Sequence, residues 1–147
     1  MSSATPTPYP PPPRRMRSTE ELEYFLNWLP TSFYAKDHSV ARRDYLTGVR
    51  NAVEWVLGRQ HSAPVSCRHS DERPSGDRVW SEQHAAHDGM AYGARQIRED
   101  YRLQEDETRV FGLQYFTGVE NTLGWVLGWD SFGRVDEDWP WPVKFDE

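Results

Sequence analysis

The stretch YLTGVRNAVEWVLG, Tyr45 to Gly58, recurs seventy residues later as YFTGVENTLGWVLG, Tyr115 to Gly128. Nine of the fourteen aligned positions are identical. Apolar residues at helical spacing predict that each copy is an amphipathic helix. The glycine that closes each copy suits the left-handed conformation in which many helices end. The sequence therefore predicts the same helix twice.

The identical positions of the repeat form two stripes on a helical wheel. Tyr45, Val49 and Val56 make an ordinary core face. The second strip, which a core does not explain, comprises Gly48, Asn51 and Trp55 in the first copy and Gly118, Asn121 and Trp125 in the second.

Three hypotheses account for this second strip. Either the repeated helices pack against each other about a pseudo-two-fold axis, or the strip is a surface for a partner. In the first case glycine permits close approach, asparagine sets the register and tryptophan covers the seam. A recent duplication that has not yet diverged is the third alternative. The outward positions argue against it, because Arg50 becomes Glu120 and Glu54 becomes Gly124.

Four helices are expected. Ser18 and Glu21 form a capping-box pattern that begins the first helix, which Pro30 should end. The others are expected over residues 40–57, 81–103 and 109–127. Glycines 89 and 93 give the third helix a thin face that suits close packing against a neighbour. We predict an all-α fold, a four-helix domain built from two tandem αα-hairpins with an internal pseudo-two-fold repeat.

The chain divides into three parts by composition. Residues 1–17 are predicted to be a disordered, Pro-rich, basic arm, and residues 18–130 the helical domain. Its repeat units span about 18–60 and 79–130, joined by an irregular, accessible linker over 60–78 that contains an unpaired Cys67. Residues 131–147 form an acidic aromatic tail in which Trp139 and Trp141 are the anchors. We expect it to fold back on the helices, with docking on a partner as the alternative.

Charge and composition limit the function. The 147 residues carry a net charge of −6, and because the arm holds three arginines and no acid, residues 18–147 carry −9. An acidic body favours a protein partner or a second copy of the chain over direct nucleic-acid binding. Twenty aromatic residues support one packed domain. The single cysteine excludes an internal disulfide, and no apolar run is long enough for a membrane span. We expect a cytoplasmic protein.

Five residues are weak candidates for a metal site: His61, Cys67 and His69 in the linker, and His84 and His87 on the third helix. They match no zinc-binding spacing, so we interpret them as exposed polar residues and expect no metal and no cofactor. The dipeptide His87-Asp88 resembles the metal-binding step of helical HD-type phosphohydrolases. That resemblance implies an upstream histidine and a distant aspartate, for which His61 or His69 and Asp130 are the nominees.

The pattern Y-x-x-G-V-x-x-A-x-x-W-V-L-G, followed by APVS, resembles helical segments in small proteins of actinobacteria and their phages. It covers Tyr45 to Ser66, and Tyr115 to Gly128 in part. The resemblance implies an accessory protein or a phage-encoded one, and it implies no activity. The sequence therefore favours a nonenzymatic interaction module that binds a protein or itself. The alternative is an acidic nucleic-acid mimic that inhibits a DNA- or RNA-binding protein, and the third hypothesis is a metal-dependent phosphohydrolase.

Overall fold

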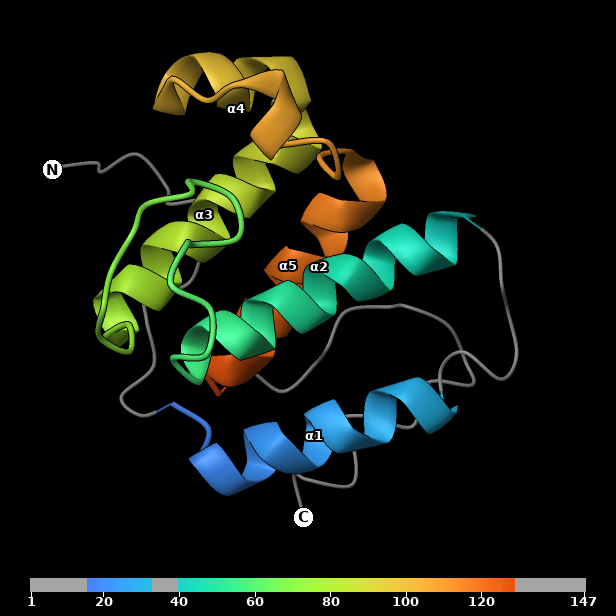
Figure 1. The fold of residues 1–147 in the computed structure, drawn as a ribbon, viewed down its shortest axis with the longest axis vertical. Helices are drawn as coiled ribbons and strands as arrows, with labels where there is room; N and C mark the ends of the chain where they lie inside the picture. The colour runs from blue at the N-terminus through green and yellow to red at the C-terminus, as the bar shows by residue number, and fades with distance from the viewer. Residues whose placement is uncertain (1–15, 33–39, 129–147) are drawn as a thin grey trace, which may run out of the picture.

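The computed structural model describes residues 16–32 and 40–128, and their regular structure is helical. In chain order the elements are α1 (Thr19–Ser32), α2 (Val40–Val56), α3 (Gly76–Tyr92), α4 (Ala94–Tyr101), the 3-10 helix η1 (Glu105–Glu107) and α5 (Leu113–Val126). These residues form no strand, only an isolated antiparallel bridge between Ser62 and His69. The all-α class is confirmed. α2 and α5 cross at the centre, with α1 and α4 on opposite sides of them (Figure 1).

The capping box at the start of α1 is confirmed. The Glu21 amide donates to Ser18 Oγ at 3.1 Å, and the Ser18 amide donates to Glu21 Oε1 at 3.0 Å. The helix then continues past Pro30 to Ser32, so the predicted end at the proline is wrong. A proline removes one N–H donor, and so close to the end of a helix this leaves the earlier turns intact.

The tail anchors Trp139 and Trp141 lie outside the described residues.

The predicted third helix is two helices. Gly93 ends α3 and precedes α4 with φ of 95°, which is outside the helical region and which L side chains rarely adopt. α3 also begins earlier than expected, at Gly76, because the Ser75 side chain accepts a hydrogen bond from the Arg78 amide. The described part of the chain therefore contains five α-helices, and the predicted count of four is corrected.

The last helix begins later than predicted. Residues 108–111 form a turn in which the Phe111 amide donates to the Thr108 carbonyl at 3.1 Å, and α5 starts at Leu113. Its C-terminal end agrees with the sequence, since Gly128 has φ of 92° and Gly58 after α2 has φ of 81°. Both copies of the repeat thus end on a left-handed glycine, as predicted.

The core lies between the two repeated helices and the elements that cover them. α3 packs closely on α5 because Gly89 lacks a side chain where the Phe116 ring lies. The predicted thin face is therefore correct at Gly89, whereas nothing lies near the missing side chain of Gly93. The largest fully buried side chains are Leu22 and Phe25 of α1, Leu46 and Trp55 of α2, Ile97 of α4, Tyr115, Phe116, Leu123 and Trp125 of α5, and Leu127 directly after α5.

Ordered contacts begin two residues before the predicted domain boundary. The Arg17 amide donates to the Val126 carbonyl at 2.7 Å, and Arg17 Nε donates to the Trp125 carbonyl at 2.9 Å. Met16 packs against the core. A cation at the C-terminal end of a helix interacts favourably with the exposed carbonyls there, so Arg17 belongs to the folded body.

Within the described ranges, no helix combines the length and the apolar character that crossing a membrane requires.

Candidate functional site

Gly48 and Gly118 lie where α2 and α5 cross. A Cβ added to Gly48 would collide with the Tyr115 carbonyl oxygen, and one added to Gly118 would collide with the Tyr45 carbonyl oxygen. The two clashes are reciprocal, because each glycine faces the first tyrosine of the other copy. Only glycine permits two backbones to approach this closely.

Asn51 and Asn121 make the second reciprocal pair of contacts. Asn51 Nδ2 donates to the Tyr115 hydroxyl at 3.3 Å, and Asn121 Nδ2 donates to the Tyr45 hydroxyl at 3.1 Å. Each asparagine thus bonds to the opposite repeated helix, and it lies about one turn after the glycine of its own helix. A half-buried polar pair of this kind disfavours a shift of one helix along the other.

The two tryptophans of the predicted strip are buried, and their ring partners come from other elements. Trp125 packs against Phe25 of α1 with ring centroids 5.3 Å apart, and the Arg17 guanidinium lies 4.9 Å above it. The Arg78 guanidinium of α3 lies 5.9 Å from the Trp55 ring centroid. The tryptophans therefore connect the crossing helices to α1 and α3. Their burial removes them as an exposed surface for a partner.

The linker is irregular, but its inner part is buried, contrary to the prediction of an accessible segment. Residues 63–66 are buried. Glu82 of α3, only 5% exposed, accepts the Val65 and Ser66 amides at 2.5 and 2.6 Å and the Ser66 hydroxyl at 2.8 Å. The Tyr115 hydroxyl donates to the Pro64 carbonyl at 2.6 Å. Because buried backbone groups need partners, these two side chains allow an irregular segment to pack inside.

The electrostatics of Glu82 and Tyr115, the two side chains that hold the buried loop, favour a structural role. Burial raises the pKa of Glu82 above its ordinary value, while the hydrogen bonds from Ser66 and Val65 oppose that shift. Burial also raises the pKa of Tyr115, so its hydroxyl stays protonated and donates. A serine that donates to a carboxylate is one component of a nucleophilic site. Here Ser66 and Glu82 are both buried and a substrate cannot reach them.

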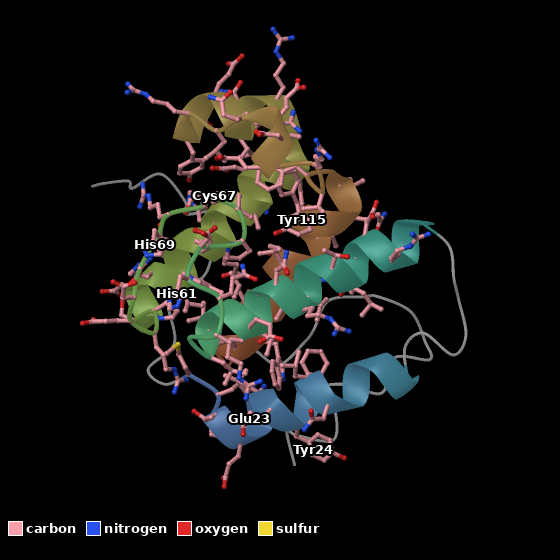
Figure 2. All side chains as sticks on the ribbon, viewed as in Figure 1. Glu23, Tyr24, His61, Cys67, His69 and Tyr115 are labelled. Carbon is pink, nitrogen blue, oxygen red and sulfur yellow. The ribbon has the colours of Figure 1, made fainter. Side chains whose placement is uncertain are left out.

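The metal candidates of the linker lie on this loop (Figure 2). The His61 and His69 rings are 5.7 Å apart, His61 Nδ1 lies 3.0 Å from the Ser70 carbonyl, and His69 Nε2 lies 3.1 Å from Asp71 Oδ1. Cys67 is half-buried, not paired in a disulfide, and has φ of 60°. Burial and the negative charges of Glu107 and Glu82 raise the pKa of its thiol to about 11. Such a thiol is a poor nucleophile.

His84 and His87 lie on α3. The His84 ring stacks on Trp80 with centroids 6.0 Å apart. Burial raises the pKa of Glu120, and the nearby His87 opposes that shift. No group of three or more His, Cys, Asp or Glu side chains that could hold a metal ion occurs in residues 16–32 and 40–128. Asp130, nominated as the distant aspartate of the hydrolase hypothesis, lies outside those residues.

Three exposed apolar residues occur at one end of the α3–α5 pair. Gly89 faces the Phe116 ring, and Gln83 Nε2 donates to the Glu120 carbonyl at 3.4 Å, so the two helices run antiparallel. Tyr92 follows Gly89 by three residues and Leu113 precedes Phe116 by three, which brings both to the same end. Tyr92 is 70% exposed, Leu113 59% and Val110, in the turn before α5, 40%. We call these three residues the α3–α5 end.

Sequence reasoning missed the α3–α5 end. Tyr92 and Leu113 each stand at a helix terminus, where the apolar periodicity does not distinguish a buried position from an exposed one. The prediction of a continuous helix over 81–103 also placed Tyr92 in its interior. The only available signal was Gly93, the residue at which the helix breaks.

An open cleft of about 460 Å³ lies beyond η1 and is lined by Arg98, Glu105, Asp106 and Arg109. Arg98 is held in place there, because its Nε donates to Thr108 Oγ1 at 2.6 Å and its Nη2 donates to the Thr108 carbonyl at 3.2 Å. The lining carries two positive and two negative charges, so it favours neither an anion nor a cation.

Comparisons of this chain with models of protein families, with curated protein sequences and with solved structures found no match.

Proposed function

We propose that this protein is a nonenzymatic interaction module that binds a protein partner or a second copy of itself. The α3–α5 end carries the proposal. Tyr92 is the anchor of the proposed interface, because it is 70% exposed and tyrosine is enriched among the residues that carry binding energy. The body is acidic, which favours a partner whose surface surrounding its contact site is basic.

The proposed architecture behind this surface is a pair of hairpins, α1–α2 and α3–α5, related by an internal pseudo-two-fold axis. The reciprocal contacts of Gly48 with Tyr115 and of Gly118 with Tyr45 support it. Arg17 over Trp125 and Arg78 over Trp55 add a third reciprocal pair. A crossing of this kind is a rigid base that holds a surface in one geometry, which lowers the entropic cost of binding.

The experiment that tests the proposal is comparative capture. The full chain and its Tyr92→Ser/Leu113→Ser variant are used as baits in a lysate of the source cells, and the recovered proteins are identified by mass spectrometry. We expect a defined partner that the parent chain recovers and the double variant loses. Arg95→Ser/Gln96→Ser on α4 is the matched control, because both residues are exposed and polar, and it should recover the partner normally.

Three other outcomes are informative. A partner recovered equally by both baits would place the binding surface elsewhere on the molecule. Competition between the chain and DNA or RNA for one protein, weakened by salt, would favour the nucleic-acid mimic. Recovery of no protein, with the chain monomeric at every concentration, would contradict the proposed function.

A further inference from the structure

The contact between α2 and α5 has the pattern of an interface between two copies of one molecule. In a two-fold symmetric dimer, residue i of one copy contacts residue j of the other, and j contacts i. The same reciprocity relates Gly48 and Tyr115 to Gly118 and Tyr45, and Asn51 and Tyr115 to Asn121 and Tyr45. The surface of α2 that receives α5 is therefore equally complementary to α5 of another chain.

The covalent connection between the two halves is narrow. The loop that follows α2 is bonded to residues of the second half from His61 onward, because the Ser70 amide donates to the His61 carbonyl at 3.0 Å and Ser62 forms a bridge with His69. Glu82 of α3 and Tyr115 of α5 then hold the part of the loop from Pro64 to Ser66. On the other side, the amides of Arg59 and Gln60 donate to the Glu54 carbonyl at 2.9 and 3.2 Å and so stay with α2. The change of direction between the halves begins at Gly58, whose φ is 81°.

We propose that two copies of this chain exchange their halves at a hinge over residues 58–60. In the exchanged dimer, α1 and α2 of one copy pack on α3, α4 and α5 of the other. Every contact between the halves is retained, including Arg17 with Trp125 and Arg73 with the Val56 carbonyl, but each now joins two chains. Only the hinge residues change conformation. This inference rests on the self-association branch of the proposed function, and it names the partner as a second copy of this chain.

The hinge offers a selective test. Valine at position 58 is strained in the monomer, because β-branched residues rarely adopt positive φ, and its Cβ would also crowd Arg73. An opened hinge relieves both problems, twice per dimer. Gly58→Val should therefore raise the dimer association constant by about tenfold for each hinge, or about 100-fold in all. The measurement is sedimentation or light scattering of reduced protein after refolding at low and high concentration.

Gly93→Val is the matched control. Gly93 also has a positive φ, of 95°, but it lies between α3 and α4 inside the second half. Its conformation is the same in the monomer and in the exchanged dimer, so the substitution should lower the stability of both and leave their ratio unchanged. An equal rise in dimer with Gly93→Val would show nonspecific association of a destabilised chain and would overturn the proposal.

Complementation distinguishes exchange from an ordinary dimer. Gly48→Leu damages only the α2 side of the crossing, and Gly118→Leu damages only the α5 side. When differently tagged copies of the two variants are refolded together, an exchanged heterodimer regains one undamaged crossing. We expect copurification of the tags and more folded protein than either variant yields alone. A mixture that behaves as the sum of its components, together with a monomeric Gly58→Val chain, overturns the exchange. Capture of a different protein through the α3–α5 end would still support the proposed function in that case.

Discussion

At the scale of single residues, the two glycines at the α2–α5 crossing and Cys67 give the most specific testable predictions. The atom that blocks a side chain at Gly48 is a backbone oxygen, which cannot rotate away as a flexible side chain can. Gly48→Ala should therefore lower the free energy of unfolding by about 1–3 kcal/mol, although alanine is the better helix former by about 1 kcal/mol. Urea denaturation measures the change. Gly76→Ala, with open space around it, should be neutral or stabilising, and stabilisation by Gly48→Ala would contradict the close crossing.

Cys67 should react slowly with thiol reagents in the folded protein. Its pKa of about 11 lies two units above the ordinary value of 9.0, so at pH 8 the thiolate fraction falls about 100-fold. Alkylation by iodoacetamide at pH 8 measures this against the urea-unfolded chain. Glu107→Gln removes a negative charge that raises the pKa of the thiol, so alkylation should become faster. Equal rates in the folded and unfolded states would show that the thiol is neither shielded nor suppressed.

At the scale of the elements, the buried loop depends on one carboxylate. Glu82→Gln replaces an acceptor of three hydrogen bonds by an amide, which presents an NH2 group to at least one donor. We expect a loss of about 1–3 kcal/mol and faster amide exchange at Val65 and Ser66. Protection in α2 and α5 should persist in mild conditions, because their crossing does not use Glu82. Glu99→Gln on the exposed face of α4 is the control. Uniform loss of protection would mean that the loop and the helices unfold together.

At the scale of the whole molecule, Arg17 joins the first described residues to the end of the last helix. Its side chain donates to the Trp125 carbonyl and covers the Trp125 ring, and its amide bonds to Val126. Arg17→Ala should cost about 1–3 kcal/mol in thermal or urea unfolding. Arg59→Ala is the comparison, since its ion pair with Glu23 is half-exposed and should contribute less than about 1 kcal/mol. Equal effects would show that Arg17 is only a surface charge.

The helical class and the repeated helix followed from the sequence itself. Local signals determine these features: the capping box at Ser18 and Glu21, the apolar period of each copy, and the glycines that end both copies. Each acts over one or two turns of the chain, so no tertiary information is needed to read it. The repeat also identified Gly48 and Gly118 in advance, because two copies under one packing constraint retain the same residues.

The remaining features depended on contacts between residues far apart in the chain. The burial of residues 63–66 requires Glu82 and Tyr115, whose distances from the loop in sequence give no local pattern. The neighbours of Trp125 depend on how α1 lies against α5, and those of Trp55 on how α3 lies against α2. The exposure of Tyr92 and Leu113 follows from how α3 lies on α5. A period of 3.6 residues shows that a helix has an apolar face but not which element covers it or where the cover ends. The tertiary structure alone decided those questions, because burial is a property of the neighbours and not of the residue.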